Sequence, residues 1–250
     1  NNIMRVGLFI PCYVDEFHPE VGIATLELLE KLGIKVEYPL EQTCCGQPMT
    51  NSGCHEESAA TEANFVRNFK DYDYIVSPSG SCTHHVRADM DAVEQSEAVK
   101  AVRSRTFELV EFLHDILKVE AFPWAEFPHK VALHNNCNAL RGLNIASMSE
   151  LRMPAFSKPR DLLNKVRGIE FTELERPDEC CGFGGTFSVF EEGVSTAMGY
   201  DKVQDQYRSG AEYVTSSDSS CMMHQQGCAE RLKLPLKYIH IAQILNGARE

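Results

Sequence analysis

The chain has no long hydrophobic run, a deficit of basic residues and no recognisable secretory signal at its start. The apolar stretches VGLFI and YIHIAQIL are far shorter than the roughly 20 residues that a helix needs to cross a bilayer. The 24 lysine and arginine residues against 36 acidic ones give a formal net charge of −12, which argues against a basic patch for nucleic acid. We therefore expect a cytoplasmic protein with no nucleic-acid partner and no membrane insertion.

Cysteine, by contrast, is abundant, and eight of the ten cysteines fall into two matching sets. Each set contains an isolated cysteine, a Cys-Cys-Gly triplet and a cysteine three residues before a histidine. The sets are Cys12, Cys44, Cys45 and Cys82, and then Cys137, Cys180, Cys181 and Cys221. Cytosolic chains keep cysteines reduced and use them for metal or redox chemistry, and adjacent cysteines make strained disulfides. Two sets of four thiols therefore indicate metal, with iron–sulfur as the natural candidate.

The rest of the chain also follows one plan twice. In the first half we predict strands at 4–10, 35–39 and 73–77, and helices at 19–33, at 55–72, after Cys82 and at 106–118. In the second half KVALHNNCN repeats RVGLFIPCY, and AEYVTSSDSSC repeats YDYIVSPSGSC. The sequence predicts an α/β fold with two pseudo-symmetric lobes, residues 4–120 and 121–250, joined by a proline-containing linker at 120–130. Each lobe is expected to be a small, mostly parallel sheet flanked by helices.

This fold gives the cysteine spacing a physical meaning. Cys12, Cys45 and Cys82 each lie just after a predicted strand, and the carboxyl ends of parallel strands meet at one edge of a sheet. We therefore expect the four thiols of each set to converge in a crevice within their own lobe, although Cys12 and Cys82 are far apart in the chain.

The motifs resemble the CCG family of cysteine-rich domains, which occur in the cysteine-rich subunit of heterodisulfide reductases and in iron–sulfur subunits of glycolate oxidase and anaerobic glycerol-3-phosphate dehydrogenase. CCGQP, SPSGSCTHHV and CCGFGGTFSV are similar to the lactate-utilization subgroup in particular. The resemblance covers essentially the whole chain from Met4. It implies an oxidoreductase or electron-transfer subunit with one iron–sulfur cluster per lobe, [4Fe–4S] in type, held by the eight cysteines. It also implies oxidation of L-lactate, or a similar 2-hydroxy acid, together with other subunits that include a ferredoxin-type iron–sulfur protein.

The chain departs from the family pattern at one position in each lobe. The family motif ends in Cys-x-x-Cys, whereas His85 and His224 stand in the places of the last cysteine. Imidazole can replace thiolate as an iron ligand. The alternative is that both histidines only lie near the crevice or face solvent, and the sequence leaves the two interpretations open.

Two other functions fit some of the same residues. Cys/His ligands could instead bind zinc, in one lobe or as a structural module, since Cys₃His coordination is common for zinc. Thiol–disulfide catalysis at the cysteine pairs would require a lowered thiol pKa.

Several further residues receive no functional assignment. Cys54 and Cys228 lie outside the repeated pattern, and lone cysteines are usually small buried residues. The GFGGTF segment lacks the spacing of a dinucleotide-binding loop. The polar residues before the cysteines are typical of turns, so we assign them no catalytic role. These are Ser79, Ser81, His134, Asn135 and Asn136.

Overall fold

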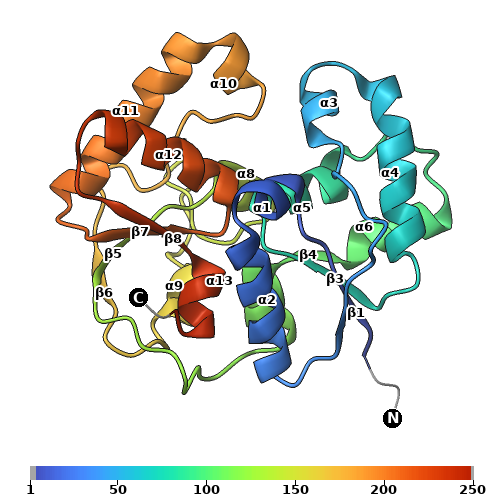
Figure 1. Ribbon diagram of the computed structural model, residues 1–250, viewed down its shortest axis with the longest axis horizontal. Helices are drawn as coiled ribbons and strands as arrows, with labels where there is room; N and C mark the ends of the chain where they lie inside the picture. Colours follow the sequence, from blue (N-terminus) through green and yellow to red (C-terminus); the bar gives the residue numbers. More distant parts are fainter. Residues whose placement is uncertain (1–3, 249–250) are drawn as a thin grey trace.

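Two four-stranded sheets, each flanked by helices, form the frame of the computed structural model, which describes residues 4–248 (Figure 1). The strand orders are β2-β1-β3-β4 and β6-β5-β7-β8, and every pairing is parallel. The strands are β1 Val6–Leu8, β2 Val36–Glu37, β3 Tyr74–Ser77, β4 Thr106–Glu108, β5 Lys130–Leu133, β6 Glu170–Thr172, β7 Tyr213–Ser216 and β8 Lys237–His240. The predicted α/β architecture with two similar lobes is thereby confirmed.

Helices follow nearly every strand. Those of the first lobe are α1 Cys12–Phe17, α2 Pro19–Lys31, α3 Gln47–Asn51, α4 His55–Phe69, α5 Gly80–His84, η1 His85–Asp89, α6 Glu97–Arg105, α7 Leu109–Glu111 and η2 Phe112–Ile116. Those of the second are α8 Cys137–Gly142, α9 Lys158–Leu163, α10 Phe187–Phe190, α11 Glu192–Arg208, α12 Ser219–Arg231 and α13 Ile241–Asn246. None of the helices in the described chain has the length and apolar character needed to span a bilayer.

One predicted element is wrong at its start. The segment 106–118 was expected to be helical throughout, but its first three residues form β4, which pairs with Ile75, Val76 and Ser77 of β3. Thr106 and Phe107 favour strands, and pairing with a buried neighbour decides the conformation of so short a segment. The helix begins only at Leu109, where the side chain of Glu108 accepts a hydrogen bond from the N–H of Val110.

A hydrophobic core runs across both lobes. One cluster of buried residues includes Val6 and Leu28 of the first lobe and Val131 and Ile241 of the second. Helices α2 and α13 lie together at this junction, where the ammonium of Lys31 donates to the carbonyl and side chain of Asn246. The boundary at residues 120 and 121 stays a prediction, and residues 249 and 250 of the expected second lobe lie outside the described residues.

Candidate metal centre

The eight predicted ligand cysteines all follow the carboxyl ends of parallel strands. Cys12 begins α1 after β1, and Cys82 lies in the first turn of α5 after β3. Cys137 and Cys221 have the matching positions, at the start of α8 after β5 and in the first turn of α12 after β7. The two cysteine pairs are in the loops after β2 and β6. In Figure 1, α1, α5, α8 and α12 accordingly meet in the middle of the molecule.

A glycine after each cysteine pair fixes the shape of the loop. Gly46 and Gly182 have φ angles of 97° and 87°, in the left-handed region that favours glycine. In this conformation the N–H of Gly46 donates to Sγ of Cys44 at 3.4 Å, and the N–H of Gly182 donates to Sγ of Cys180 at 3.4 Å. A backbone N–H directed at sulfur stabilises a thiolate there. The Cys-Cys-Gly sequence therefore builds the same local structure in both lobes.

The thiols of the first lobe form a connected series. Sγ of Cys12 lies 3.9 Å from Sγ of Cys44. Hydrogen bonds from Cys12 and Cys45 hold the pKa of Cys44 far below its usual value, and the bond to Cys44 raises the pKa of Cys12. Side-chain hydrogen bonds with Cys44 and Cys82 raise the pKa of the buried Cys45 thiol. Of these thiols, Cys44 is the one whose pKa is lowered by its neighbours.

The second lobe repeats this pattern residue for residue. Hydrogen bonds from Cys137 and Cys181 lower the pKa of Cys180, and the bond to Cys180 raises the pKa of Cys137. Side-chain hydrogen bonds with Cys180 and Cys221 raise the pKa of Cys181. Thiols that are hydrogen-bonded to one another lie close enough to bind the same positively charged metal centre. Such a centre deprotonates the remaining thiols when it binds.

Both sets of cysteines line a single pocket of about 320 Å³. The sequence predicted a crevice within each lobe, whereas all eight thiols open onto this one shared space. Its remaining wall includes apolar side chains from both lobes, among them Tyr13, Pro48, Phe183 and Val189. Cys54 and Cys228 are not among the lining residues: Cys54 is exposed and Cys228 is buried elsewhere.

A buried carboxylate connects the two lobes beside this pocket. Asp218, the N-cap of α12, is 1% exposed. Its Oδ2 accepts hydrogen bonds from the backbone N–H and hydroxyl of Ser81 at 3.0 and 2.8 Å, and from the hydroxyl of Ser79 at 3.1 Å. Its Oδ1 accepts from the hydroxyl of Ser220 at 2.5 Å. Asp218 therefore ties the loop before Cys82 to its own helix.

His85, one of the two histidines considered as ligands, is completely buried behind the first set of cysteines. Within residues 4–248 neither of its ring nitrogens has a hydrogen-bond partner, and Nε2 lies 4.0 Å from the buried carboxylate of Glu62. Burial lowers the pKa of His85, and the acidic Asp89 and Cys44 oppose this shift. It does not line the pocket, and ligation by His85 stays a prediction.

His224 has a different environment from His85. Its Nε2–H donates to the backbone carbonyl of Ser195 at 3.3 Å, and Sγ of Cys228 lies 4.0 Å from the same nitrogen. Burial lowers the pKa of His224. The Nε2 side of this ring faces α11, and His224 does not line the pocket, so ligation by His224 stays a prediction.

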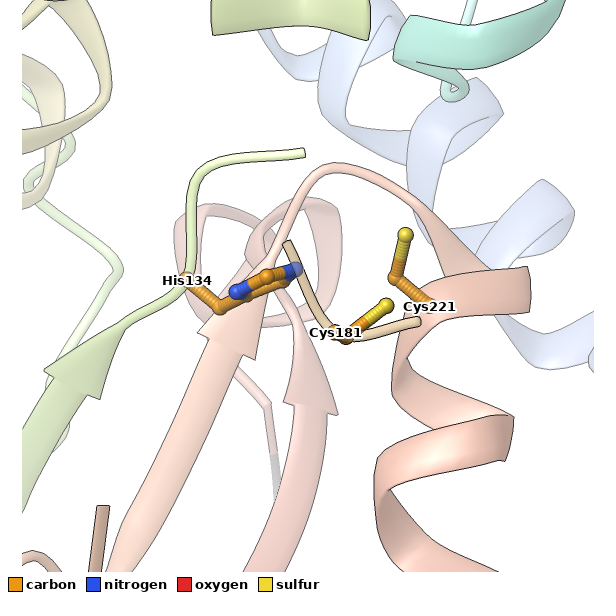
Figure 2. A group of neighbouring side chains, drawn as sticks. All are labelled: His134, Cys181 and Cys221. Atoms are coloured by element: carbon orange, nitrogen blue, oxygen red, sulfur yellow. The ribbon is translucent and has the colours of Figure 1, made fainter. Parts of the chain in front are cut away.

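His134, directly after β5, is one of the residues that received no functional assignment from the sequence. A ring nitrogen of His134 and the sulfurs of Cys181 and Cys221 all lie within 4.8 Å of one another. Figure 2 shows the ring extending from the end of the strand toward the two sulfurs. His134 is 1% exposed, and both ring nitrogens are without a hydrogen-bond partner in the described chain. Burial, reinforced by the charge of Lys202, lowers the pKa of His134 to about 3, so the imidazole is neutral.

These donors suit a metal centre in each lobe. Thiolates and neutral imidazoles are the ligands that iron–sulfur groups and zinc take in proteins. Hydrogen-bond donors directed at the sulfurs, including the amide of Asn136 at 3.1 Å from Sγ of Cys221, are typical of the surroundings of such a centre. His134 has buried, unpartnered ring nitrogens, and a bound metal would satisfy the one that faces the sulfurs.

Comparison with known proteins places these motifs in a family. The CCG cysteine-rich domain matches twice, over residues 6–87 and 131–226. Lactate utilization protein A of an Exiguobacterium species is 41% identical over 249 residues, covering 97% of each chain. The protein of the same name from Bacillus subtilis is 38% identical over 247 residues, covering 97% of this chain and 99% of its own.

A solved structure shares the fold. The crystal structure of a hypothetical protein from Helicobacter pylori matches with a TM-score of 0.55 at 12% identity. The match covers all of this chain and 50% of the Helicobacter chain. At this identity the likeness concerns the arrangement of helices and strands alone.

Proposed function

Because the chain belongs to the family of CCG cysteine-rich domain proteins, we propose that each lobe holds an iron–sulfur cluster, with [4Fe–4S] as the type, and that the protein is an electron-transfer subunit of an oxidoreductase. The observation that carries this proposal is the shared pocket, whose wall contains all eight cysteines of the two motifs. Four thiolates per lobe suit such a group, which when bound accepts and releases single electrons.

The residues around the cysteines support the same function. In each lobe the glycine N–H and the neighbouring thiols lower the pKa of one cysteine, Cys44 or Cys180, which favours its thiolate form. Apolar side chains such as Phe183 and Val189 form part of the pocket wall, while Ser81 and Ser220 offer hydroxyl groups there. A small polar molecule could therefore approach both metal-binding sets from one pocket.

The substrate proposal comes from the relatives. Proteins named lactate utilization protein A are similar over nearly the full length of the chain, so we extend the proposal to the oxidation of L-lactate to pyruvate. The chain has no closely spaced Cys-x-x-Cys-x-x-Cys run, so a ferredoxin-type cluster would come from a partner subunit. Eight reduced thiols require a reducing compartment, which favours the cytoplasm.

Metal content in matched variants tests the two-site proposal. Protein purified without oxygen should contain iron and acid-labile sulfide, and Cys45→Ser and Cys181→Ser should each remove about half of both, since each changes one lobe. Cys54→Ser, an exposed cysteine outside the pocket, is the control and should keep the full content. A loss of all iron, or of none, in either single-lobe variant would contradict two independent sites.

The substrate is tested on the protein isolated under anaerobic conditions with its native partners. Adding L-lactate should bleach the visible absorption of the complex, while D-lactate and buffer should not. If dithionite bleaches the complex but L-lactate does not, the electron-transfer proposal stands and the lactate proposal fails.

A zinc site in the second lobe is the second candidate. The observation that favours it is the close grouping of His134, Cys181 and Cys221, a set of ligands that zinc accepts. Stoichiometric zinc without visible absorption would support it, and iron with sulfide in both lobes would exclude it.

A further inference from the structure

His134 has no structural partner for either ring nitrogen within the described chain, although it is 1% exposed. Leaving buried polar atoms unpaired costs about 1–3 kcal/mol, so native proteins retain such groups only where something else satisfies them. The atoms that surround one of the nitrogens are the sulfurs of Cys181 and Cys221, all within 4.8 Å of one another. No other group of three histidine, cysteine or acidic side chains in residues 4–248 brings its ligand atoms this close together.

The first lobe provides a direct comparison, because its counterpart of His134 is Phe9. Each residue stands three positions before the isolated cysteine of its lobe. The N–H of Phe9 donates to the carbonyl of Val76, and the N–H of His134 donates to the carbonyl of Thr215, both at 2.9 Å. The backbone is therefore the same at the two places, and only the side chain differs.

The space occupied by the two side chains is also lined differently. The ring of Phe9 packs against Phe65 with the ring centroids 4.9 Å apart, edge to face. The matching part of the second lobe contains the buried side chain of Lys202, whose Nζ donates to the carbonyl of Arg176 at 2.9 Å. The first environment suits a packing residue, whereas in the second a polar imidazole without a hydrogen-bond partner in the described chain faces two sulfurs.

We propose that His134 donates a ring nitrogen to the metal centre of the second lobe, together with Cys181 and Cys221, and that Phe9 gives the first lobe no donor at this place. This inference rests on the proposed function, because it assumes that the second set of cysteines binds metal. It assigns a ligand outside the repeated cysteine pattern. It also makes the two centres chemically different, since a neutral imidazole adds no negative charge where a thiolate would.

The test uses protein labelled with ¹⁵N in its histidines, purified without oxygen. Cys45→Ser is introduced to leave only the second centre, which is then reduced with dithionite. Pulsed EPR should detect a histidine nitrogen coupled to that centre. The coupling should disappear in His134→Phe, which copies the first lobe, and persist in His224→Gln, which removes the neighbouring imidazole.

The outcomes separate this inference from the function on which it rests. Iron and sulfide present in the second lobe without any histidine coupling would overturn the role of His134 and leave the cluster proposal standing. Coupling that persists in His134→Phe would also overturn it. The spectrum of the labelled protein with His134 intact is decisive even if the phenylalanine variant fails to fold.

Metal analysis covers the remaining case. If the second lobe contains one zinc ion that is lost in His134→Phe and kept in His224→Gln, His134 is a ligand and the iron–sulfur proposal fails for that lobe. If neither iron nor zinc binds to the second lobe, both proposals fail together.

Discussion

The two lobes share a backbone plan but differ in the wall behind their cysteines. In the first lobe the part of this wall around Phe9 is aromatic, with His85 and Glu62 buried beside it. Phe9 packs against Phe65 and Phe69 with ring centroids 4.9 and 5.8 Å apart, and the two helical phenylalanines lie 4.7 Å from each other. All three side chains are buried, and Cys45 belongs to the same hydrophobic cluster.

In the second lobe the corresponding wall is polar. Ser58 and Ser195 lie beside the glycines that follow the two cysteine pairs, so α4 and α11 can be aligned on them. Seven residues further along, Phe65 of α4 corresponds to Lys202 of α11. The buried Lys202 donates from Nζ to the carbonyl of Arg176 at 2.9 Å. His134 stands where the first lobe has Phe9.

This difference shows how one fold can make two unlike sites from the same cysteines. Aromatic side chains exclude water and offer no charge, so they favour the less charged form of whatever the first set binds. A neutral imidazole and a buried ammonium stabilise negative charge on the second set. We therefore expect the centre of the second lobe to be reduced at the higher potential.

The largest effect is expected where the lobes meet, at Asp218. Its counterpart Ser79 has the same position before the last cysteine of its motif and also caps a helix. Asp218→Ala leaves the N–H and hydroxyl of Ser81 without their acceptor in a buried place, so the free energy of unfolding should fall by about 3–4 kcal/mol. Ser79→Ala removes the cap of α5 together with one of the donors to Asp218, and should cost about 1–2 kcal/mol. Urea unfolding without oxygen measures both values.

The contrast between these two variants is the informative quantity. Asp218→Asn keeps an oxygen acceptor, so its loss of unfolding free energy should lie between the losses of Asp218→Ala and Ser79→Ala. Equal losses for Asp218→Ala and Ser79→Ala would mean that the carboxylate contributes nothing beyond an ordinary cap, and that the lobes are held together by their common hydrophobic core.

A second contrast concerns the residues that end the last strand of each sheet. Glu108 pairs with Ser77, and His240 occupies the same register opposite Ser216. Each caps the helix that follows it, and both are completely buried. Burial raises the pKa of Glu108 well above 4.5 and lowers the pKa of His240 from 6.5 to about 4. Each lobe thus buries a neutral titratable group, of opposite chemical type.

The signs of the two pH dependences are therefore opposite. The pKa of Glu108 is 4.5 in the unfolded chain and higher in the folded protein. The stability that Glu108 contributes is therefore complete below pH 4.5 and is lost as the pH rises through the folded pKa. The contribution of His240 is complete above pH 6.5 and is lost as the pH falls toward 4. Glu108→Gln should accordingly stabilise the protein at pH 8, where the buried carboxyl is penalised, and have much less effect at pH 4.5.

His240→Asn is the matched variant, because asparagine also caps helices. In this variant the free energy of unfolding should fall less between pH 6.5 and 4 than in the unaltered protein. Above pH 7 the free energies of unfolding of the two proteins should change with pH in parallel. Chemical unfolding across pH 4.5 to 8 checks both variants. Parallel curves for all three proteins would show that neither group stays neutral in the fold.

The sequence was sufficient for the features that depend on local spacing. The strand-like runs before Cys12 and Cys137 and the repeated Cys-Cys-Gly triplets predicted parallel sheets with cysteines at their carboxyl ends. Those features follow from short-range chemistry: strand preference, then a glycine that can adopt a positive φ.

What the sequence could not provide depends on packing between distant segments. The shared pocket arises because the lobes face each other, and no spacing within one motif reports that arrangement. His134 followed by two asparagines is typical of a turn, and only its burial next to Cys181 distinguishes it. One signal was available: aligning the lobes on Cys12 and Cys137 sets His134 against Phe9, a polar residue against a core residue.

The smallest predicted effect tests the polar wall through a single hydrogen bond. Asn136 caps α8 through Oδ1, which accepts from the N–H of Ala139 at 2.9 Å, and its Nδ2 donates to Sγ of Cys221 at 3.1 Å. Its counterpart Pro11 has no hydrogen to donate to sulfur. Asn136→Ser keeps a capping oxygen and removes the bond to sulfur. Since that bond stabilises the more negative, reduced state, the potential of the second centre should fall by roughly 40 mV, equivalent to about 1 kcal/mol for one electron.

An EPR-monitored redox titration measures this shift, with the first centre of the same molecule as the internal reference. Asn138→Ser, which changes a pocket residue close to Cys137, is the control and should leave both potentials in place. A potential that stays constant or rises in Asn136→Ser would mean that the amide does not act on the bound centre. The difference between the lobes would then have to come from His134 and Lys202. His134→Phe separates their effects, because it removes a donor atom and leaves the charge of Lys202 in place.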